Sequence, residues 1–179
     1  MNKRKLILYI SCSLDGFIAG PNDDLSFLNP MQLEGEDYGY QSFVDTVDTV
    51  IVGRRTYDWV VNQGYDFPHT NKECYILTSQ TRAKEGSLTF YQGDLKELVQ
   101  RLKSSNSQKH IFCDGGAQVV HQLLSAQLID EIILSVVPVL LGAGTKLFKE
   151  DRPQQLLELL SSKSFESGLL QLHYKVAAV

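Results

Sequence analysis

The sequence predicts a three-layer α/β fold with a central, mostly parallel mixed sheet, helices on both faces and a C-terminal antiparallel hairpin. Short runs of β-branched and aromatic residues alternate with short helical patterns, which is typical of parallel strands joined by crossover helices. Two strands pass through glycine directly into a helix, at Gly53 and at Gly115–Gly116. The last two apolar runs meet at Ser167–Gly168, where we expect a turn. We expect residues 1–179 to form one domain.

The N-terminal part begins with a predicted strand over residues 5–12. Residues 13–24 are expected to form a loop, because two glycines, a proline and an Asn-Asp-Asp run interrupt any regular pattern. A loop of this length often covers a binding site. Residues 36–47 carry apolar side chains at helical spacing, which predicts a short helix. A strand over 48–53 and a brief helix over 56–61 are expected next.

The middle of the chain repeats the alternation of strands and helices. Asp94 is a predicted N-cap, and Glu97 stands at the capping-box position of a helix over 95–103. The other elements expected here are strands over 73–78, 88–91 and 109–113 and a helix over 117–125.

The C-terminal third changes character. A long, mostly apolar strand-like run over 129–141 is interrupted by Pro138 and followed by a glycine loop over 142–148. Two strands, over 155–165 and 168–176, then form the predicted hairpin.

Composition and charge exclude several classes of protein. The formal net charge of −4 argues against a general nucleic-acid or membrane-surface binder. The sequence has no apolar segment long enough to span a bilayer, so a cytoplasmic protein is expected. The three cysteines lie in apolar, strand-like runs and are expected to be buried free thiols. Their spacing suggests no metal site.

Both strand–glycine–helix junctions are predicted to bind phosphate. Glycine lets a ligand approach the backbone, and the start of a helix offers unpaired N–H groups and a positive dipole end. After Gly53, the first helical turn contains Arg54, Arg55 and Thr56. The positive end of the helix dipole repels an arginine in the first turn, unless a bound anion offsets this repulsion. Two such junctions predict a ligand with several phosphates, such as a dinucleotide. Neither is a GxGxxG motif, which disfavours the usual Rossmann site.

Four motifs, in this order, resemble the dihydrofolate reductase-like superfamily. Within it, the chain is most similar to the C-terminal reductase domain of bifunctional riboflavin-biosynthesis enzymes and its stand-alone relatives. The motifs are Ser13–Gly16, Val52–Tyr57, Gly115–Ala117 and Ile129–Glu131, and the run Val139–Phe148 also fits. The resemblance covers nearly the whole chain. It implies NADPH as cofactor, a homodimer, and hydride transfer to a C=N or C=O bond of a small heterocycle, as in 5-amino-6-(5-phosphoribosylamino)uracil reductase.

The resemblance also implies which residues contact the cofactor. Residues at the two junctions would bind its phosphates, two at the end of a strand would lie beside the adenosine ribose, and Arg82 would reach a 2′-phosphate, which favours NADPH over NADH. Two residues of the first loop would lie against the nicotinamide. The full set is Ala19, Gly20, Gly53, Arg54, Arg55, Thr56, Thr78, Ser79, Arg82, Gly115, Gly116, Ala117, Gln118 and Val119.

Asp37 is the candidate proton donor. Dihydrofolate reductases carry a carboxylate on the helix before the Gly-Arg junction, and Asp37 lies at a similar spacing before Gly53. Burial would raise its pKa and suit it to that role. The alternative is an acid that only stabilises a helix start. Tyr38, Tyr40 and Phe43 are expected either to stack on a flat substrate or to pack in the core. Asp15 is expected to bond backbone amides in a turn, with substrate contact as the alternative.

The charge pattern narrows the substrate. Between Cys12 and Gly53 there is no lysine or arginine, but there are several carboxylates. A phosphorylated riboflavin intermediate requires cations nearby, so a neutral or cationic heterocycle fits this segment better. Two alternatives stay open: a true dihydrofolate reductase, and a non-catalytic nucleotide-binding relic of the fold.

Overall fold

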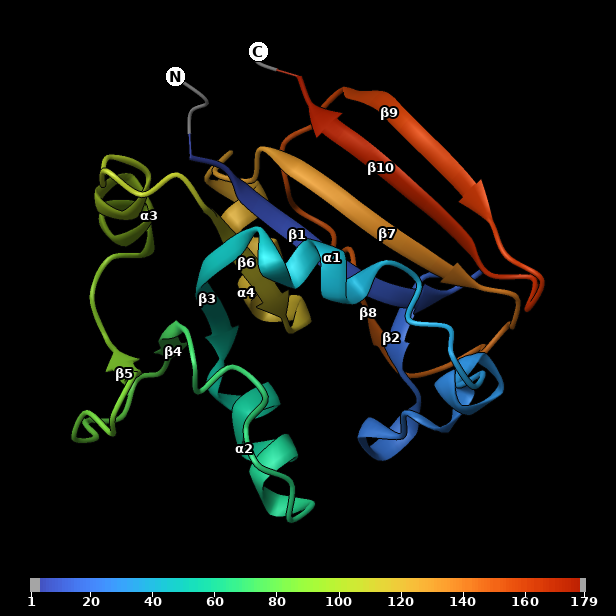
Figure 1. The fold of residues 1–179 in the computed structure, drawn as a ribbon, viewed down its shortest axis with the longest axis horizontal. Helices are drawn as coiled ribbons and strands as arrows, with labels where there is room; N and C mark the ends of the chain where they lie inside the picture. Colours follow the sequence, from blue (N-terminus) through green and yellow to red (C-terminus); the bar gives the residue numbers. More distant parts are fainter. Residues whose placement is uncertain (1–3, 178–179) are drawn as a thin grey trace.

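The structure is a computed structural model that describes residues 4–177. An eight-stranded sheet forms its centre, in the order β5-β4-β3-β6-β1-β7-β10-β9 (Figure 1). The strands from β5 to β7 in this order are parallel, and β10 is antiparallel to both β7 and β9. The predicted mixed sheet with a C-terminal hairpin is therefore confirmed. The strands are β1 (Leu6–Ser13), β3 (Val47–Gly53), β4 (Glu73–Leu77), β5 (Leu88–Tyr91), β6 (His110–Gly115), β7 (Glu131–Val137), β9 (Leu157–Ser164) and β10 (Leu170–Val176).

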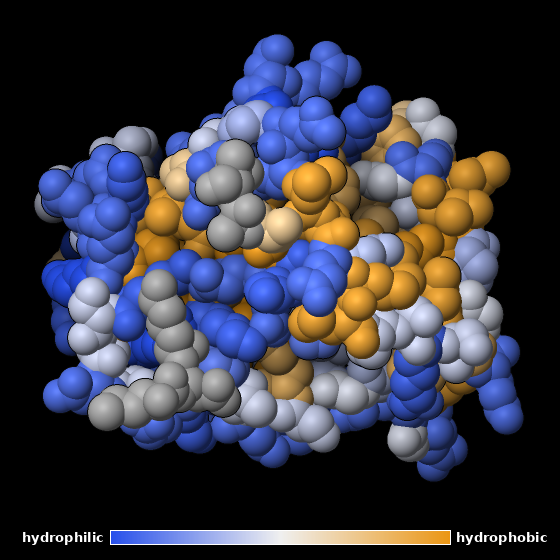
Figure 2. All heavy atoms as spheres, turned by 90° about the horizontal axis from the view of Figure 1, so that it is seen from above, coloured by the Kyte–Doolittle hydropathy of each residue, from blue (hydrophilic) through white to orange (hydrophobic). Residues whose placement is uncertain are grey.

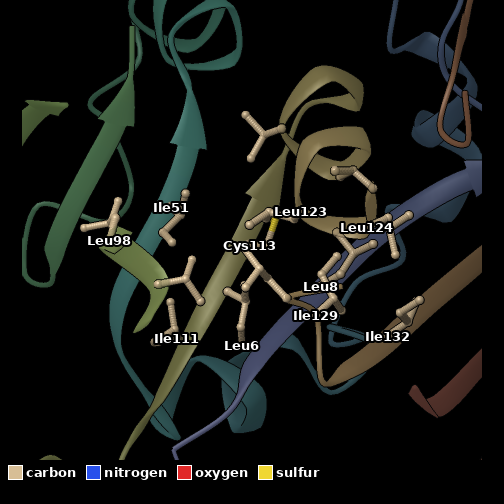
Figure 3. Packing of buried hydrophobic residues seen from close by; sticks show 14 of the residues in the cluster. Leu6, Leu8, Ile51, Leu98, Ile111, Cys113, Leu123, Leu124, Ile129 and Ile132 are labelled. Atoms are coloured by element: carbon tan, nitrogen blue, oxygen red, sulfur yellow. The ribbon is translucent and has the colours of Figure 1, made fainter. Parts of the chain in front are cut away.

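Helices cover both faces of the sheet, as predicted. In Figure 1, α1 (Tyr40–Asp45) lies in front of the sheet and α4 (Ala117–Ser125) lies behind it. The buried side chains divide in the same way. One apolar cluster joins α3 (Leu95–Lys103) and α4 to the sheet (Figure 3), and the other contains Phe43 of α1 and Tyr57 of α2 (Arg54–Asn62).

The alternation of side chains along β6 shows how the two layers are built. Ile111 and Cys113 belong to the α3–α4 cluster, and Phe112 between them belongs to the α1–α2 cluster. Because β6 is a central strand with apolar neighbours on both faces, it reads as a continuous apolar run. Phe112 is 1% exposed, and its replacement by alanine should cost about 3–5 kcal/mol of stability.

Helix α1 is shorter than the predicted helix over 36–47. Tyr38 and Gly39 have φ angles of 55° and 79°, which a continuing right-handed helix does not allow. The chain therefore enters the helix only at Tyr40, and β3 begins soon after its end.

The glycine-rich loops contain short elements that the sequence pattern did not indicate. Strand β2 (Phe17–Ala19) pairs with β8 (Thr145–Lys146) to form a small antiparallel sheet. Two 3-10 helices, η1 (Pro21–Asp23) and η2 (Ser26–Met31), follow β2. The expected loops over 13–24 and 142–148 are thus partly ordered, because each supplies the partner strand of the other.

The apolar run over 129–141 forms a shorter strand than predicted. Strand β7 ends at Val137, directly before Pro138, which has no N–H group for the ladder.

Among the helices of residues 4–177, none has the length and apolar character needed to cross a membrane.

Candidate functional site

A cleft of about 1220 Å³ opens at the carboxyl ends of the parallel strands. It extends from the end of β5 and the start of α3, past the starts of α2 and α4, to β1 and β2. In Figure 1, α2 lies below the sheet, with β5 at the lower left and β2 at the lower right. Ligands of open α/β sheets bind in this position, because loops and helix starts converge there.

The two strand–glycine–helix junctions are direct neighbours in this cleft. Val52 and Gly115 are paired in the β3–β6 ladder. A Cβ atom at Gly116 would lie 3.0 Å from Thr56 Oγ1, and one at Gly53 would lie 3.1 Å from Val119 Cγ2. Such spacing is too tight for a larger residue without adjustment. Glycine therefore allows the starts of α2 and α4 to lie side by side, as a ligand with several phosphates requires.

The starts of α2 and α4 differ from the start of α3 in their capping. Neither α2 nor α4 has a side-chain hydrogen bond at its N-cap, whereas Asp94 caps α3 by accepting a hydrogen bond from the Glu97 amide. The first-turn amides of α2 and α4 lack this kind of partner. The predicted Asp94 cap is confirmed.

The two arginines of α2 each have an acidic partner. Arg54 Nη1 lies 2.6 Å from Asp58 Oδ2, one turn further along the helix. Arg55 Nη2 lies 2.7 Å from Oδ1 of Asp23, a residue of η1 that also lines the cleft. These acids offset the unfavourable position of the arginines at a helix start. The arginine pair alone is therefore weaker support for an anionic ligand than the sequence suggested.

Most of the predicted cofactor residues line the cleft. They are Ala19, Gly53, Arg54, Arg55, Thr56, Thr78, Ser79, Gly116, Ala117, Gln118 and Val119. Gly20, Arg82 and Gly115 lie outside this lining. The guanidinium of Arg82 packs over the Phe90 ring and lies 3.5 Å from Asp58 Oδ1, so its predicted contact with a 2′-phosphate would require it to move.

One part of the cleft lies on the side of the sheet that α1 covers. Tyr9, Ser11, Tyr40, Phe112 and Asp114 line this part, which we call the α1 side. Burial raises the pKa of the Tyr9 and Tyr40 hydroxyls, and the nearby Asp114 charge raises that of Tyr40 further. Of the predicted substrate residues, only Tyr40 lies here.

Asp37 does not have the environment expected of a buried acid. Its side chain is exposed and accepts hydrogen bonds from the backbone amides of Gly39 and Gln41, at 2.8 and 3.0 Å. The Gln41 and Gly39 amides lower the pKa of Asp37, so the expectation of a raised pKa was wrong. Asp37 stabilises the start of α1, which matches the alternative interpretation.

Asp15, Tyr38 and Phe43 also have structural contacts. The Asp15 carboxylate accepts hydrogen bonds from the Ser13 hydroxyl and from the backbone amides of Leu141 and Gly142, on the loop after β7. Asp15 does accept hydrogen bonds from backbone amides, but the prediction that these belong to its own turn was wrong, because they lie on a loop distant in sequence. Phe43 is buried beside Tyr9, and the Tyr38 hydroxyl donates to the Met31 carbonyl.

Sequence reasoning missed several lining residues. The sequence did contain a signal for Asp114, because this acid ends a buried strand directly before two glycines. Tyr9 and Ser11 follow from period-two alternation along β1 once the face of the sheet is known. Lys149, whose Nζ lies 2.6 Å from Gln118 Oε1, gave no local signal because the contact depends on the tertiary fold.

Similar solved structures identify the fold. A putative riboflavin biosynthesis protein from Shewanella sp. PV-4 matches with a TM-score of 0.87 and 26% identity, over 97% of this chain and 99% of that one. A dihydrofolate reductase from Enterococcus faecalis, solved as a complex with NADP(H), matches with a TM-score of 0.69 and 16% identity, over 98% of each chain. The chain therefore has the dihydrofolate reductase-like fold.

The family is defined by sequence. Residues 4–171 match the model of the RibD C-terminal domain, and the chain belongs to that family. The protein YwjB of Bacillus subtilis (strain 168) is 39% identical over 173 residues, which cover 96% of this chain and 98% of YwjB. YyaP of the same organism is 29% identical over 186 residues, covering 97% and 96%. Both are described as uncharacterized.

Proposed function

We propose that the protein is an NADPH-dependent reductase of the riboflavin-biosynthesis reductase-domain type. The observation that carries the proposal is a single continuous cleft that reaches both strand–glycine–helix junctions. Family membership and the fold support a reductase, and the adjacent, uncapped starts of α2 and α4 support a ligand with several phosphates.

The residues of the cleft fit this cofactor. The amides after Gly53 and Gly116 would bind its phosphates, with the hydroxyl of Thr56 between the two junctions. Thr78 and Ser79 would lie beside the adenosine ribose, toward the β4–β5 end of the cleft. When bound, NADPH supplies the hydride. The protein contributes binding, orientation and exclusion of water.

Asp114 is our proposed substrate-facing carboxylate, in place of Asp37. It lies on the α1 side of the cleft, close to the junction that would hold the cofactor. A carboxylate here can accept a hydrogen bond from a ring N–H or amino group, or hold a proton for the reduced nitrogen.

We further propose that the substrate is a flat, neutral or cationic heterocycle without phosphate. The four basic residues that line the cleft are Arg54, Arg55, Lys96 and Lys149, and they belong to α2, α3 and the loop after β8. The α1 side offers aromatic rings and a carboxylate instead. This distribution favours a cationic or hydrogen-bond-donating ring over a phosphorylated riboflavin intermediate.

The decisive experiment is titration of the protein with NADPH and NADH while the fluorescence of Trp59 is recorded. Trp59 lines the cleft, so a bound dinucleotide should change its emission. Oxidation of NADPH is then followed with pterin, aminopyrimidine and carbonyl substrates. Turnover of dihydrofolate would identify a true dihydrofolate reductase. Binding without turnover of any substrate would support the non-catalytic relic, and absence of binding would refute the proposal.

We also propose a cytoplasmic homodimer that forms through β9 and β10. Every residue of β9 is exposed, and apolar side chains lie at the surface on this side of the molecule (Figure 2). Leu159 and Leu160 are 53% and 46% exposed. Apolar residues concentrated on one surface of a soluble protein usually mark an interface.

A further inference from the structure

Three aspartates line the cleft, and their side chains have different partners. Both oxygens of Asp23 accept hydrogen bonds from the Arg55 guanidinium, and Asp94 accepts one from the Glu97 amide as the cap of α3. Within residues 4–177, the Asp114 side chain has one hydrogen-bond partner, His69, whose Nε2 lies 3.3 Å from Oδ2. The Asp114 side chain is 28% exposed in the cleft. Its other oxygen, Oδ1, is therefore available to a ligand.

His69 is held in place from several sides. The residue is 2% exposed, and its ring makes edge contacts with the rings of Phe67 and Phe112, at centroid distances of 5.3 and 5.5 Å. Its backbone carbonyl accepts hydrogen bonds from the Lys72 amide and the Cys74 thiol. The imidazole therefore has little freedom to rotate, and its orientation is set before any ligand arrives.

The contact orients Asp114. A carboxylate only accepts hydrogen bonds, so the pairing requires the ring proton on Nε2 of His69. That N–H group uses one lone pair of Oδ2 and orients the carboxylate relative to the cleft, which leaves Oδ1 and the second lone pair of Oδ2 for a ligand. In other enzymes, buried partners of this kind keep a functional side chain in the productive orientation.

We propose that His69 is a positioning residue that holds the Asp114 carboxylate in the orientation needed to accept paired N–H donors of an amino-substituted nitrogen heterocycle. The inference rests on the proposed function, because it gives the same cleft a substrate class. His69 does not line the cleft and acts only through Asp114.

The test uses 2,4-diaminopyrimidine as the probe, because its amino group and protonated ring nitrogen present two parallel N–H donors. Its affinity is measured by calorimetry for the wild-type protein, His69→Leu, His69→Gln, Asp114→Asn and the double variant His69→Leu/Asp114→Asn. His110→Leu, at the opposite end of β6, is the matched control. Folding of each variant is checked by thermal unfolding, and NADPH affinity is measured in the same samples through Trp59.

We expect His69→Leu to weaken the probe about tenfold, because one oriented hydrogen bond is lost. His69→Gln retains an N–H donor and should stay within about threefold of wild type. In the Asp114→Asn background, His69→Leu should have no further effect, since positioning requires the carboxylate. NADPH affinity should not change in the His69 variants.

Three results would overturn the proposal. These are failure of the wild-type protein to bind the probe, equal weakening by leucine and glutamine, and an effect of His69→Leu that persists without Asp114. A protein that binds the probe with this pattern but does not bind NADPH would refute the proposed reductase function while leaving the role of His69 intact.

Discussion

Arg55 has an acidic partner that would compete with a bound cofactor. In the structure it pairs with Asp23, which also lines the cleft, and a cofactor phosphate would have to take the place of that carboxylate. Asp23 thus competes with an anionic ligand for the same guanidinium. Since the pair is exposed, it contributes little to stability, about 0–1 kcal/mol.

The combined substitution Arg54→Ala and Arg55→Ala should weaken NADPH binding by about 2–4 kcal/mol, since two charge-assisted hydrogen bonds are lost. Fluorescence titration of Trp59 measures this as a rise in Kd of roughly 30- to 700-fold. Asp23→Asn should have the opposite sign and strengthen binding by up to about fivefold, because it frees Arg55. Arg101→Ala, on α3 away from the cleft, is the matched control. An unchanged Kd in the double variant would remove Arg54 and Arg55 from the cofactor site.

A second residue-scale prediction separates the two candidate carboxylates. Asp114→Asn should lower kcat by about 100-fold or more if the carboxylate holds or delivers the proton, with the NADPH Kd unchanged. Asp37→Asn removes one backbone contact at the start of α1, and should lower Tm slightly with kcat within about twofold of wild type. Steady-state kinetics with the best substrate from the panel decides between them. If Asp37→Asn proves the more damaging variant, the original assignment of Asp37 as proton donor is restored.

At the scale of elements, Asp15 joins two loops that border the cleft. Its contacts connect the turn after β1 to the loop after β7, next to the small sheet of β2 and β8. The Ser13 hydroxyl and the Gly142 and Leu141 amides lower the pKa of Asp15 to about 2. A carboxylate with a lowered folded-state pKa stabilises the fold only while it is ionised.

The lowered pKa of Asp15 determines how the stability of the fold changes with pH. In the unfolded chain the pKa of aspartate is about 3.9, so the stabilisation by Asp15 is complete above about pH 4 and is lost as the pH falls toward 2. Asp15→Ala should therefore lower Tm at neutral pH, and the difference from wild type should narrow below pH 4. Thermal unfolding between pH 7 and pH 2 measures it, with the exposed Asp66→Ala as control. A Tm difference that stays constant over this range would exclude the ionised carboxylate as the cause.

The same elements show what a sequence can predict. The central strands and the helices α2 to α4 follow from local signals, namely apolar runs, glycine junctions and the Asp94 cap. The length of α1 was predicted wrongly, although Gly39 inside the expected helix was a local signal against it; the left-handed φ angle of Tyr38 could not be read from the sequence, because such residues rarely adopt it. Strands β2 and β8 are more than a hundred residues apart and order each other. The Asp114–His69 contact is likewise visible only when the fold brings β6 beside the segment before β4.

At the scale of the whole molecule, the three cysteines report on the integrity of both apolar clusters. Cys12, Cys74 and Cys113 are all buried free thiols, as predicted. Burial raises the pKa of Cys12 to about 11 and those of Cys74 and Cys113 to about 12. At pH 8 a thiol of pKa 11 is about 0.1% thiolate, the reactive form. A thiol reagent should therefore label the native protein very slowly and label all three cysteines in denaturant. Fast labelling of one cysteine in the native protein would show that its side of the core opens.

At the same scale, substitutions in β9 test whether the protein forms a homodimer. Leu157 and Leu159 are two residues apart and share one face of β9, an exposed strand that no helix covers (Figure 1). Leu159 is 53% exposed. If a second copy covers this strand, each buried leucine contributes about 1.5–3 kcal/mol to association. Leu157→Lys together with Leu159→Lys should then raise the dimer Kd by at least about 100-fold and yield monomers in sedimentation equilibrium. Leu140→Lys, at a leucine outside the hairpin that is 70% exposed, should leave the dimer intact. Because the cleft lies at the carboxyl ends of the parallel strands, away from the exposed strand β9, the monomeric variant should still bind NADPH with wild-type affinity. A wild-type protein that sediments as a monomer at all concentrations would contradict the dimer.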